Sequence, residues 1–194
     1  MTSEHDTARR AVMLTLAGLP LIGLAAQASG GEVKNAESRA LVAYFSRSGN
    51  TRVVAGLIHR TLGTDLFEIR PARSYPEDYL ETVEQARQER NSGYEPPLEA
   101  RIPNMACYDT VYLGFPIWVE TTPPVIRAFL SAHDLTGKTL IPFVTHGGYG
   151  LGNSSSILAS HAPKARISKG FVMQADQERQ TMERVNAWLK QRTE

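Results

Sequence analysis

The sequence predicts a doubly wound α/β fold: a five-stranded parallel sheet with helices on both faces. Short apolar runs alternate five times with segments of helical periodicity, which is the pattern of parallel strands joined by crossover helices. There is no internal repeat and no sign of a second domain after residue 40. Three of the apolar runs are followed by loops of unusual composition. Under the common strand order 2-1-3-4-5, the three loops meet at one edge of the sheet, where such folds bind ligands.

The composition is that of an ordinary globular protein. The chain has 194 residues, of which 42% are hydrophobic and 21% charged, enough for one domain with a full core. A formal net charge of +1 gives no reason to expect a nucleic-acid partner. The single cysteine, Cys107, excludes an internal disulfide, and we expect it to be buried where it leads into a strand. No metal-ligand spacing occurs, so no metal site is expected.

The first 28 residues differ in kind from the rest. Arg9 and Arg10 directly precede the apolar run 11–24, and Ala26-Gln27-Ala28 is a small-residue cleavage pattern. This order predicts an export signal resembling the twin-arginine type, and therefore a periplasmic protein. The alternatives are a membrane anchor over 11–28 or a buried helix in a cytoplasmic protein. Gly and Pro residues interrupt the run, which is short for a membrane span, and this favours a removable signal.

The domain is expected to span residues 40–194, after a polar linker at 29–39. Its strands are recognised as short runs that are apolar almost throughout, because strands buried on both faces lack polar alternation. The expected strands are 40–45, 65–69, 110–116, 139–145 and 165–172.

The helices are recognised by their starts and by apolar residues at helical spacing. Proline favours the first helical turn, whereas asparagine and serine favour the cap before it. On the second helix we expect Tyr79, Val83 and Ala86 to share a face. The segment 91–104 is rich in turn residues and either caps a site or is a plain surface connection. The expected helices begin at Asn50 or Thr51, Pro76, Pro123, Asn153 and Gln177, and end near Gly63, Arg90, Ser131, His161 and Lys190.

The first unusual loop lies between the first strand and the first helix. It reads Ser46-Arg-Ser-Gly-Asn-Thr51, and its hydroxyls and backbone N–H groups stand at a helix start, which attracts anions. Neither the triphosphate motif nor the dinucleotide fingerprint is present. The loop therefore suits a monophosphate held mainly by neutral donors, although the same residues also make a good turn and helix cap.

The second and third loops offer a flat ligand surface. Trp118 follows the third expected strand between prolines, and a Trp there either stacks on an aromatic ligand or shields the end of the sheet. The third loop, Thr145-His-Gly-Gly-Tyr-Gly-Leu-Gly152, exposes backbone N–H groups and carries Tyr149 as a second ring. By itself it is equally consistent with a flexible surface loop.

Together the three loops resemble those of the flavodoxin-like proteins that bind flavin mononucleotide (FMN). The resemblance runs from about Ala40 to the C-terminus and has the motifs in the family's order. It implies that the first loop holds the flavin phosphate, that Trp118 flanks the ring, and that residues 145–149 pass its pyrimidine side. The residues expected to contact the cofactor are Ser46, Arg47, Ser48, Gly49, Asn50, Thr51, Pro116, Ile117, Trp118, Thr145, His146, Gly147, Gly148 and Tyr149.

Three features depart from that family. Flavodoxins proper are strongly acidic, whereas this chain has a net charge of +1. Many relatives have a Gly after the ring-flanking residue, but here Val119 and Glu120 follow Trp118, and neither takes positive φ easily. Arg47 adds a positive charge to a loop that is often neutral. We therefore expect the flavin to pass mainly between its fully oxidised and fully reduced forms.

The leading functional hypothesis is a redox protein that transfers electrons through non-covalently bound FMN, with a protein partner or a small-molecule acceptor. No side chain is required as a catalyst, although His146 is a candidate proton donor. A reductase that takes hydride from a nicotinamide and reduces a quinone is the first alternative. A non-redox module that binds another phosphate compound is the second. A hydrolase is disfavoured because Gly-x-Ser-x-Gly is absent.

Overall fold

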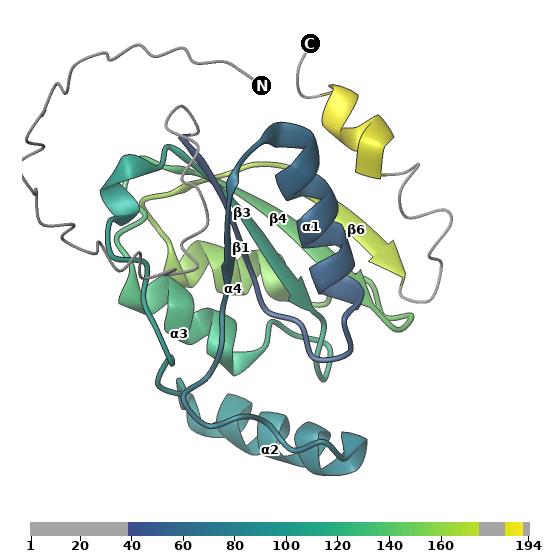
Figure 1. The fold of residues 1–194 in the computed structure, drawn as a ribbon. Helices are drawn as coiled ribbons and strands as arrows, with labels where there is room; N and C mark the ends of the chain where they lie inside the picture. The colour runs from purple at the N-terminus through teal and green to yellow at the C-terminus, as the bar shows by residue number, and fades with distance from the viewer. Residues whose placement is uncertain (1–38, 175–184, 192–194) are drawn as a thin grey trace, which may run out of the picture. The chain divides into compact units, whose positions relative to one another are not determined.

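The structure is a computed structural model, and it describes residues 39–174 and 185–191. Strands and helices alternate along the chain as expected, and Figure 1 shows their arrangement. The elements are β1 (Ala40–Tyr44), α1 (Asn50–Leu62), β2 (Asp65–Glu68), α2 (Tyr79–Ser92), the short 3-10 helix η1 (Met105–Cys107), β3 (Thr110–Pro116), α3 (Pro124–Ala132), β4 (Thr139–His146), α4 (Ser154–His161), β5 (Arg166–Ile167) and β6 (Phe171–Gln174).

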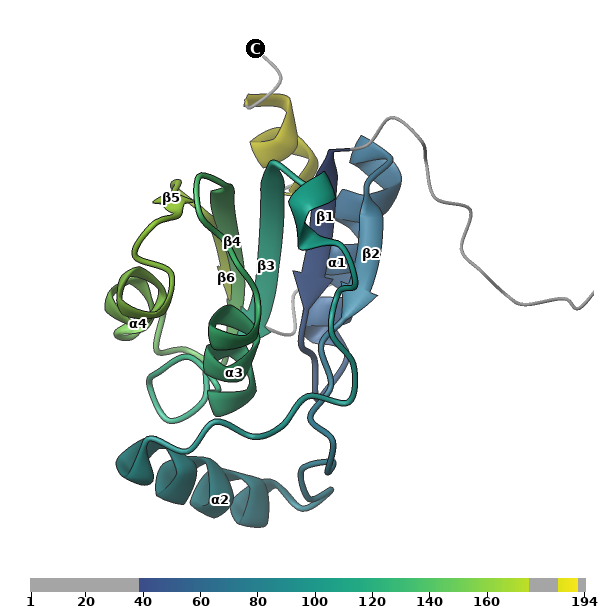
Figure 2. The same cartoon turned by 90° about the vertical axis from the view of Figure 1, so that its left-hand side faces the viewer.

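The sheet confirms the predicted doubly wound order. Its strands run β2-β1-β3-β4-β5, β6 also pairs with β4, and every pairing is parallel. Along β1, Leu41 and Ala43 join one buried cluster while Val42 and Tyr44 join the other, as alternation along a strand requires. The first cluster contains α3 and α4 residues, and the second contains residues of α1 and of the helical segment 185–191. Figure 2 shows α3 and α4 across the sheet from α1.

Helix α2 covers neither face of the sheet. It lies beyond the end towards which the arrows of β1 and β2 point (Figure 2), so it stands near the carboxyl edge, where the three loops emerge. It begins at Tyr79, not Pro76 as predicted, because the Asp78 side chain accepts a hydrogen bond from the Glu81 N–H at 2.9 Å and caps the helix. Tyr79 and Ala86 lie two turns apart on one face, as predicted, but Tyr79 is 66% exposed while Ala86 is buried, so that face is covered only further along the helix.

The predicted fifth strand is in fact two strands. β5 pairs with Thr139 and Leu140, and β6 pairs with residues 143–146 of β4, so the break lies opposite Ile141 and Pro142. Pro142 has no N–H to give to a sheet ladder. A Cβ at Gly170, in the connection between β5 and β6, would lie only 2.0 Å from the Pro142 carbonyl oxygen. The chain therefore passes Pro142 in close contact but without regular pairing.

The structure also bears on the predictions for Cys107 and for the last helix. Cys107 is exposed and lies in η1, so its predicted burial is wrong, and the Asn104 side-chain amide approaches its sulfur at 2.7 Å. Of the predicted last helix, residues 185–191 are described and are helical. The remainder of that helix, the export signal and nearly all of the linker lie outside the described residues.

Within the described ranges, none of the helices combines the length and apolar character that crossing a bilayer requires. The same ranges contain no grouping of His, Cys, Asp and Glu side chains suited to a metal ion.

Candidate functional site

The first loop has the geometry of an anion site. Gly49 stands directly before α1 with φ of 96°, and its N–H donates to the Ser46 hydroxyl at 3.2 Å. A glycine cap has no side chain to accept from the first turn of the helix, so that turn is open to an external acceptor. Ser46 and Asn50 are half-buried and Ser48 is exposed, which leaves polar groups around the start of α1.

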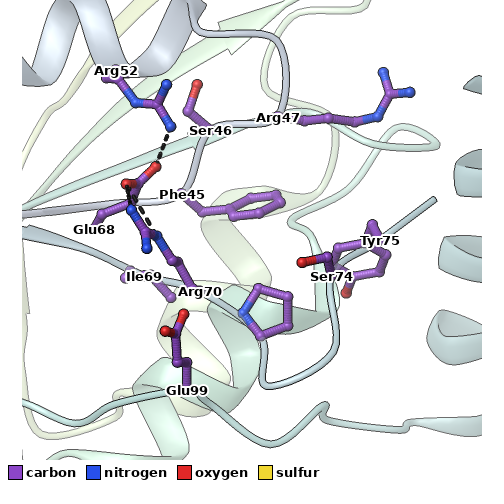
Figure 3. A pocket seen from close by; sticks show the side chains of 11 residues that line it. Phe45, Ser46, Arg47, Arg52, Glu68, Ile69, Arg70, Ser74, Tyr75 and Glu99 are labelled. Carbon is purple, nitrogen blue, oxygen red and sulfur yellow. Dashed lines mark hydrogen bonds and ion pairs between the residues drawn. The ribbon is translucent and has the colours of Figure 1, made fainter. Parts of the chain in front are cut away.

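Arg47 is directed away from this helix start. Its guanidinium donates to the Glu77 carbonyl at 2.5 Å and lies over the Tyr79 ring, 5.9 Å from the ring centroid. Figure 3 shows the side chain extending away from Arg52 and Glu68. Arg47 therefore contributes only backbone groups to the helix start. Its guanidinium links the loop to Glu77, in the segment before α2.

Thr51 joins the first loop to the third. Its side chain is 1% exposed, and its hydroxyl lies 2.8 Å from that of Thr145, which is 3% exposed. The Thr145 carbonyl in turn accepts from the Ile117 N–H at 2.8 Å, at the start of the second loop. Thr145 thus contacts both other loops, and the predicted meeting of the three at the carboxyl edge is observed.

Trp118 shields the end of the sheet, which is one of the two roles considered for it. Its half-buried ring meets the Phe45 ring edge to face, at a centroid distance of 5.1 Å, and the Tyr75 ring at 4.8 Å. These contacts close the end of one core cluster and fix the ring's orientation. Sequence reasoning missed Tyr75, because it lies in an irregular segment far from Trp118 in sequence and no local pattern marks the contact.

The residues after Trp118 form a strained turn. Trp118 and Thr121 exchange backbone hydrogen bonds of 3.0 and 2.9 Å, and the two residues between them, Val119 and Glu120, have φ of 47° and 62°. Two central residues with positive φ are typical of a type I′ turn, which prefers Asn and Gly. The expectation that Val119 and Glu120 avoid positive φ is therefore wrong. Positive φ at these positions removes one reason to expect that the flavin passes mainly between its fully oxidised and fully reduced forms.

Neighbouring elements hold this turn in place. The Arg90 guanidinium, from the last turn of α2, donates to the Val119 carbonyl at 3.1 Å, and the Asn153 N–H donates to the Glu120 carbonyl at 3.3 Å. A Cβ at Gly152 would lie 1.9 Å from the Glu120 oxygen, so only glycine permits this approach. Such surrounding contacts are what allow a strained backbone to persist. Nothing in the sequence identified Arg90.

The third loop presents one strongly exposed ring. Tyr149 is 75% exposed, and Gly147 and Gly148 are also exposed. The His146 Nδ1 accepts from the Gly148 N–H at 3.0 Å, which turns the loop back on itself. With Pro116 and Ile117 half-buried at the end of β3, all the predicted contact residues lie in the three loops at this edge.

A cavity of about 360 Å³ lies where the second and third loops approach α2. Arg90, residues 119–121, Tyr149, Gly152 and Asn153 line it. The Tyr149 ring and the exposed backbone of Gly152 in this lining fit a planar ligand. The open start of α1 fits a phosphate. The described residues therefore suit a ligand that joins a flat ring system to a phosphate.

Comparison with known proteins places the chain in a family. Residues 39–192 match the family model described as flavodoxin. A Bacteroides uniformis structure assigned as a flavoprotein is 33% identical, covers 78% of this chain and 97% of its own, and has a TM-score of 0.69. A Bacteroides eggerthii structure with the same assignment is also 33% identical, with coverages of 78% and 95% and a TM-score of 0.68.

A more distant structure shares the fold. The Lactobacillus acidophilus flavoprotein in complex with FMN is 20% identical, with coverages of 74% and 97% and a TM-score of 0.59. No curated protein matches the chain. The family match covers most of the sequence and agrees with the observed strand order. This chain is a member of the flavodoxin family.

Proposed function

We propose that this protein transfers electrons through a non-covalently bound FMN. The observation that carries the proposal is the convergence of the three loops, held together by the hydroxyl contact of Thr51 with Thr145 and by the bond from the Ile117 N–H to the Thr145 carbonyl. FMN is the cofactor that family membership supports. Its isoalloxazine ring supplies the redox chemistry when bound.

The protein's own residues bind and orient the cofactor. The start of α1 and the hydroxyls of Ser46 and Ser48 hold the phosphate, and Trp118, locked by Phe45 and Tyr75, fixes one side of the ring site. Tyr149 offers a second ring from the third loop. The His146 Nδ1 accepts a hydrogen bond from the Gly148 N–H at 3.0 Å, which helps to fix the course of the third loop beside the proposed ring site.

The net charge of the chain is relevant to the kind of electron acceptor that it uses. A net charge of +1 gives the protein no net negative charge to steer it towards basic proteins. A small-molecule acceptor is therefore as compatible with the composition as a redox protein is.

The test is to purify the protein, record its visible spectrum, and add reduced nicotinamide cofactor and dithionite separately under anaerobic conditions. An electron carrier is expected to be yellow, to bleach at once with dithionite, and to react slowly with nicotinamide. Rapid bleaching by nicotinamide would assign it instead as a reductase. A colourless protein that takes up no added FMN would refute the redox proposal.

We also propose that the protein works after export. The support is the order of Arg9, Arg10 and the apolar run 11–24, and the twin-arginine route carries folded proteins, so FMN would be inserted beforehand. Changing both arginines to lysine is expected to retain the protein inside the cell, measured by fractionation against wild type. Unchanged export of the double-lysine variant would rule out this route.

A further inference from the structure

A second cavity lies on the β2 side of the phosphate loop. It measures about 270 Å³ and lies between the ends of β1 and β2 and the segment that follows β2. Figure 3 shows Arg52, Glu68 and Arg70 along one wall, Ser74 and Tyr75 opposite them, and the Phe45 ring between. Apart from Ser46 and Arg47, none of the lining residues belongs to the three loops. The cavity therefore adjoins the candidate cofactor site and shares only Ser46 and Arg47 with it.

The interior of this cavity suits a ring. The side chains of Phe45, Ile69, Pro71 and Tyr75 contribute to its lining, and Phe45 and Ile69 belong to the buried core. Phe45 and Tyr75 also hold Trp118 at centroid distances of 5.1 and 4.8 Å. Two of its walls are thus fixed by packing, which makes the cavity preformed. Its volume is slightly below the range for drug-sized ligands and suits a compound of one or two rings.

The rim carries more positive than negative charge. Three arginines and two glutamates line the cavity. Arg52 and Arg70 share one carboxylate, because Arg52 contacts one oxygen of Glu68 at 2.5 Å and Arg70 contacts the other at 2.7 Å. Burial raises the pKa of Glu68, but the hydrogen bonds from the two guanidiniums outweigh it and lower the pKa. Glu68 therefore stays charged at neutral pH and keeps both guanidiniums in position beside the opening.

The two arginines keep donors for a ligand. Arg70 uses its Nε and one terminal nitrogen on Glu68. Arg52 uses one terminal nitrogen on Glu68 and also hydrogen-bonds the Tyr44 side chain. A guanidinium has five N–H donors in a planar fork, which suits a carboxylate. The Ser74 hydroxyl adds a neutral donor at the same opening. Glu99 also lines the cavity, so the three arginines exceed the two glutamates by one positive charge, which a bound anion can balance.

From this combination we propose that the cavity is a binding site for a small aromatic carboxylate, separate from the FMN site. The ring packs on Phe45 and Tyr75, and the carboxylate accepts hydrogen bonds from Arg52 and Arg70. This assignment does not depend on FMN binding, since the cavity is formed by the chain alone.

The experiment is calorimetric titration of the full-length protein with 2-naphthoate and with its neutral amide, 2-naphthamide, as the matched probe. We expect naphthoate to bind at least about tenfold more tightly, and Arg52→Met and Arg70→Met each to remove most of that preference without weakening the amide. Arg87→Met is the control, because Arg87 is an exposed α2 arginine paired with Glu84, outside the cavity. Thermal unfolding of each variant shows whether it is folded.

Three outcomes would overturn the proposal: no binding of naphthoate, equal affinity for acid and amide, or an unchanged preference in both cavity variants. Repeating the titration with FMN present tests the separation of the two sites. Naphthoate is expected to bind with unchanged affinity, and displacement by FMN would show that the cavity belongs to the cofactor site. Failure of the protein to bind FMN would refute the proposed function and leave the naphthoate result standing.

Discussion

Replacing Gly152 with Ala is expected to weaken FMN binding by about 100-fold and to lower the free energy of unfolding by about 2–4 kcal/mol. Gly152 has φ of 52°, and an added Cβ would lie 1.9 Å from the Glu120 carbonyl oxygen and 2.6 Å from its carbon. Because both obstructing atoms are backbone, the second and third loops must move apart. The measurements are denaturant unfolding and titration of the variant with FMN.

Gly150→Ala provides a matched control in the same loop. Gly150 also has positive φ, 66°, but an added Cβ there meets nothing within 4 Å. It should lose about 1 kcal/mol from the left-handed backbone alone and keep most of its FMN affinity. Equal losses in the two variants would show that backbone conformation, and not the contact between the loops, decides the effect.

Breaking the contact between Thr51 and Thr145 is the second large effect that we expect. Thr51→Val leaves the Thr145 hydroxyl buried without its 2.8 Å partner, and Thr145→Val does the same to the Thr51 hydroxyl. Each single variant should lose about 1–3 kcal/mol of stability, whereas the double valine variant should lie within about 1 kcal/mol of wild type. Thr51→Val should also lower FMN affinity, because Thr51 lies in the phosphate loop. A double-mutant cycle followed by denaturant unfolding gives the coupling energy.

Thr64→Val is the control for the loss of a buried hydroxyl as such. The Thr64 side-chain oxygen is buried and has no hydrogen-bond partner among the described residues, so its removal should be neutral or stabilising. Additive effects of the two changes at Thr51 and Thr145 would contradict a direct interaction between them.

Much of the fold could be predicted from the sequence because its signals are local. The largely apolar run 110–116 matches β3 residue for residue, and Gly63 ends α1 in a left-handed cap, since both depend on neighbouring residues alone. The split of the last strand was not predicted. It depends on Pro142, which lies on a different strand from the residues that it prevents from pairing.

The three loops of the site could be predicted from the sequence, but the contacts that hold them in place could not. The start of α1, Trp118 and the glycine-rich loop are visible as strand-end patterns. The turn at Val119 and Glu120 contradicts the preferences of both residues. Its conformation is favoured by Arg90 and Asn153, and no sequence rule pairs residues of such separation. Tertiary contacts outweighed local preference in the turn, which lies at the site where function is expected.

The central claim is that the start of α1 holds the phosphate of a flavin whose ring lies at the other two loops. Fluorescence titration of the flavin-free protein with FMN and with riboflavin, which lacks only the phosphate, tests it most directly. We predict one FMN per chain and at least about 100-fold weaker binding of riboflavin, because riboflavin cannot accept the charge-assisted hydrogen bonds at the helix start. Equal affinity for the two flavins, or no binding of either, would contradict the claim.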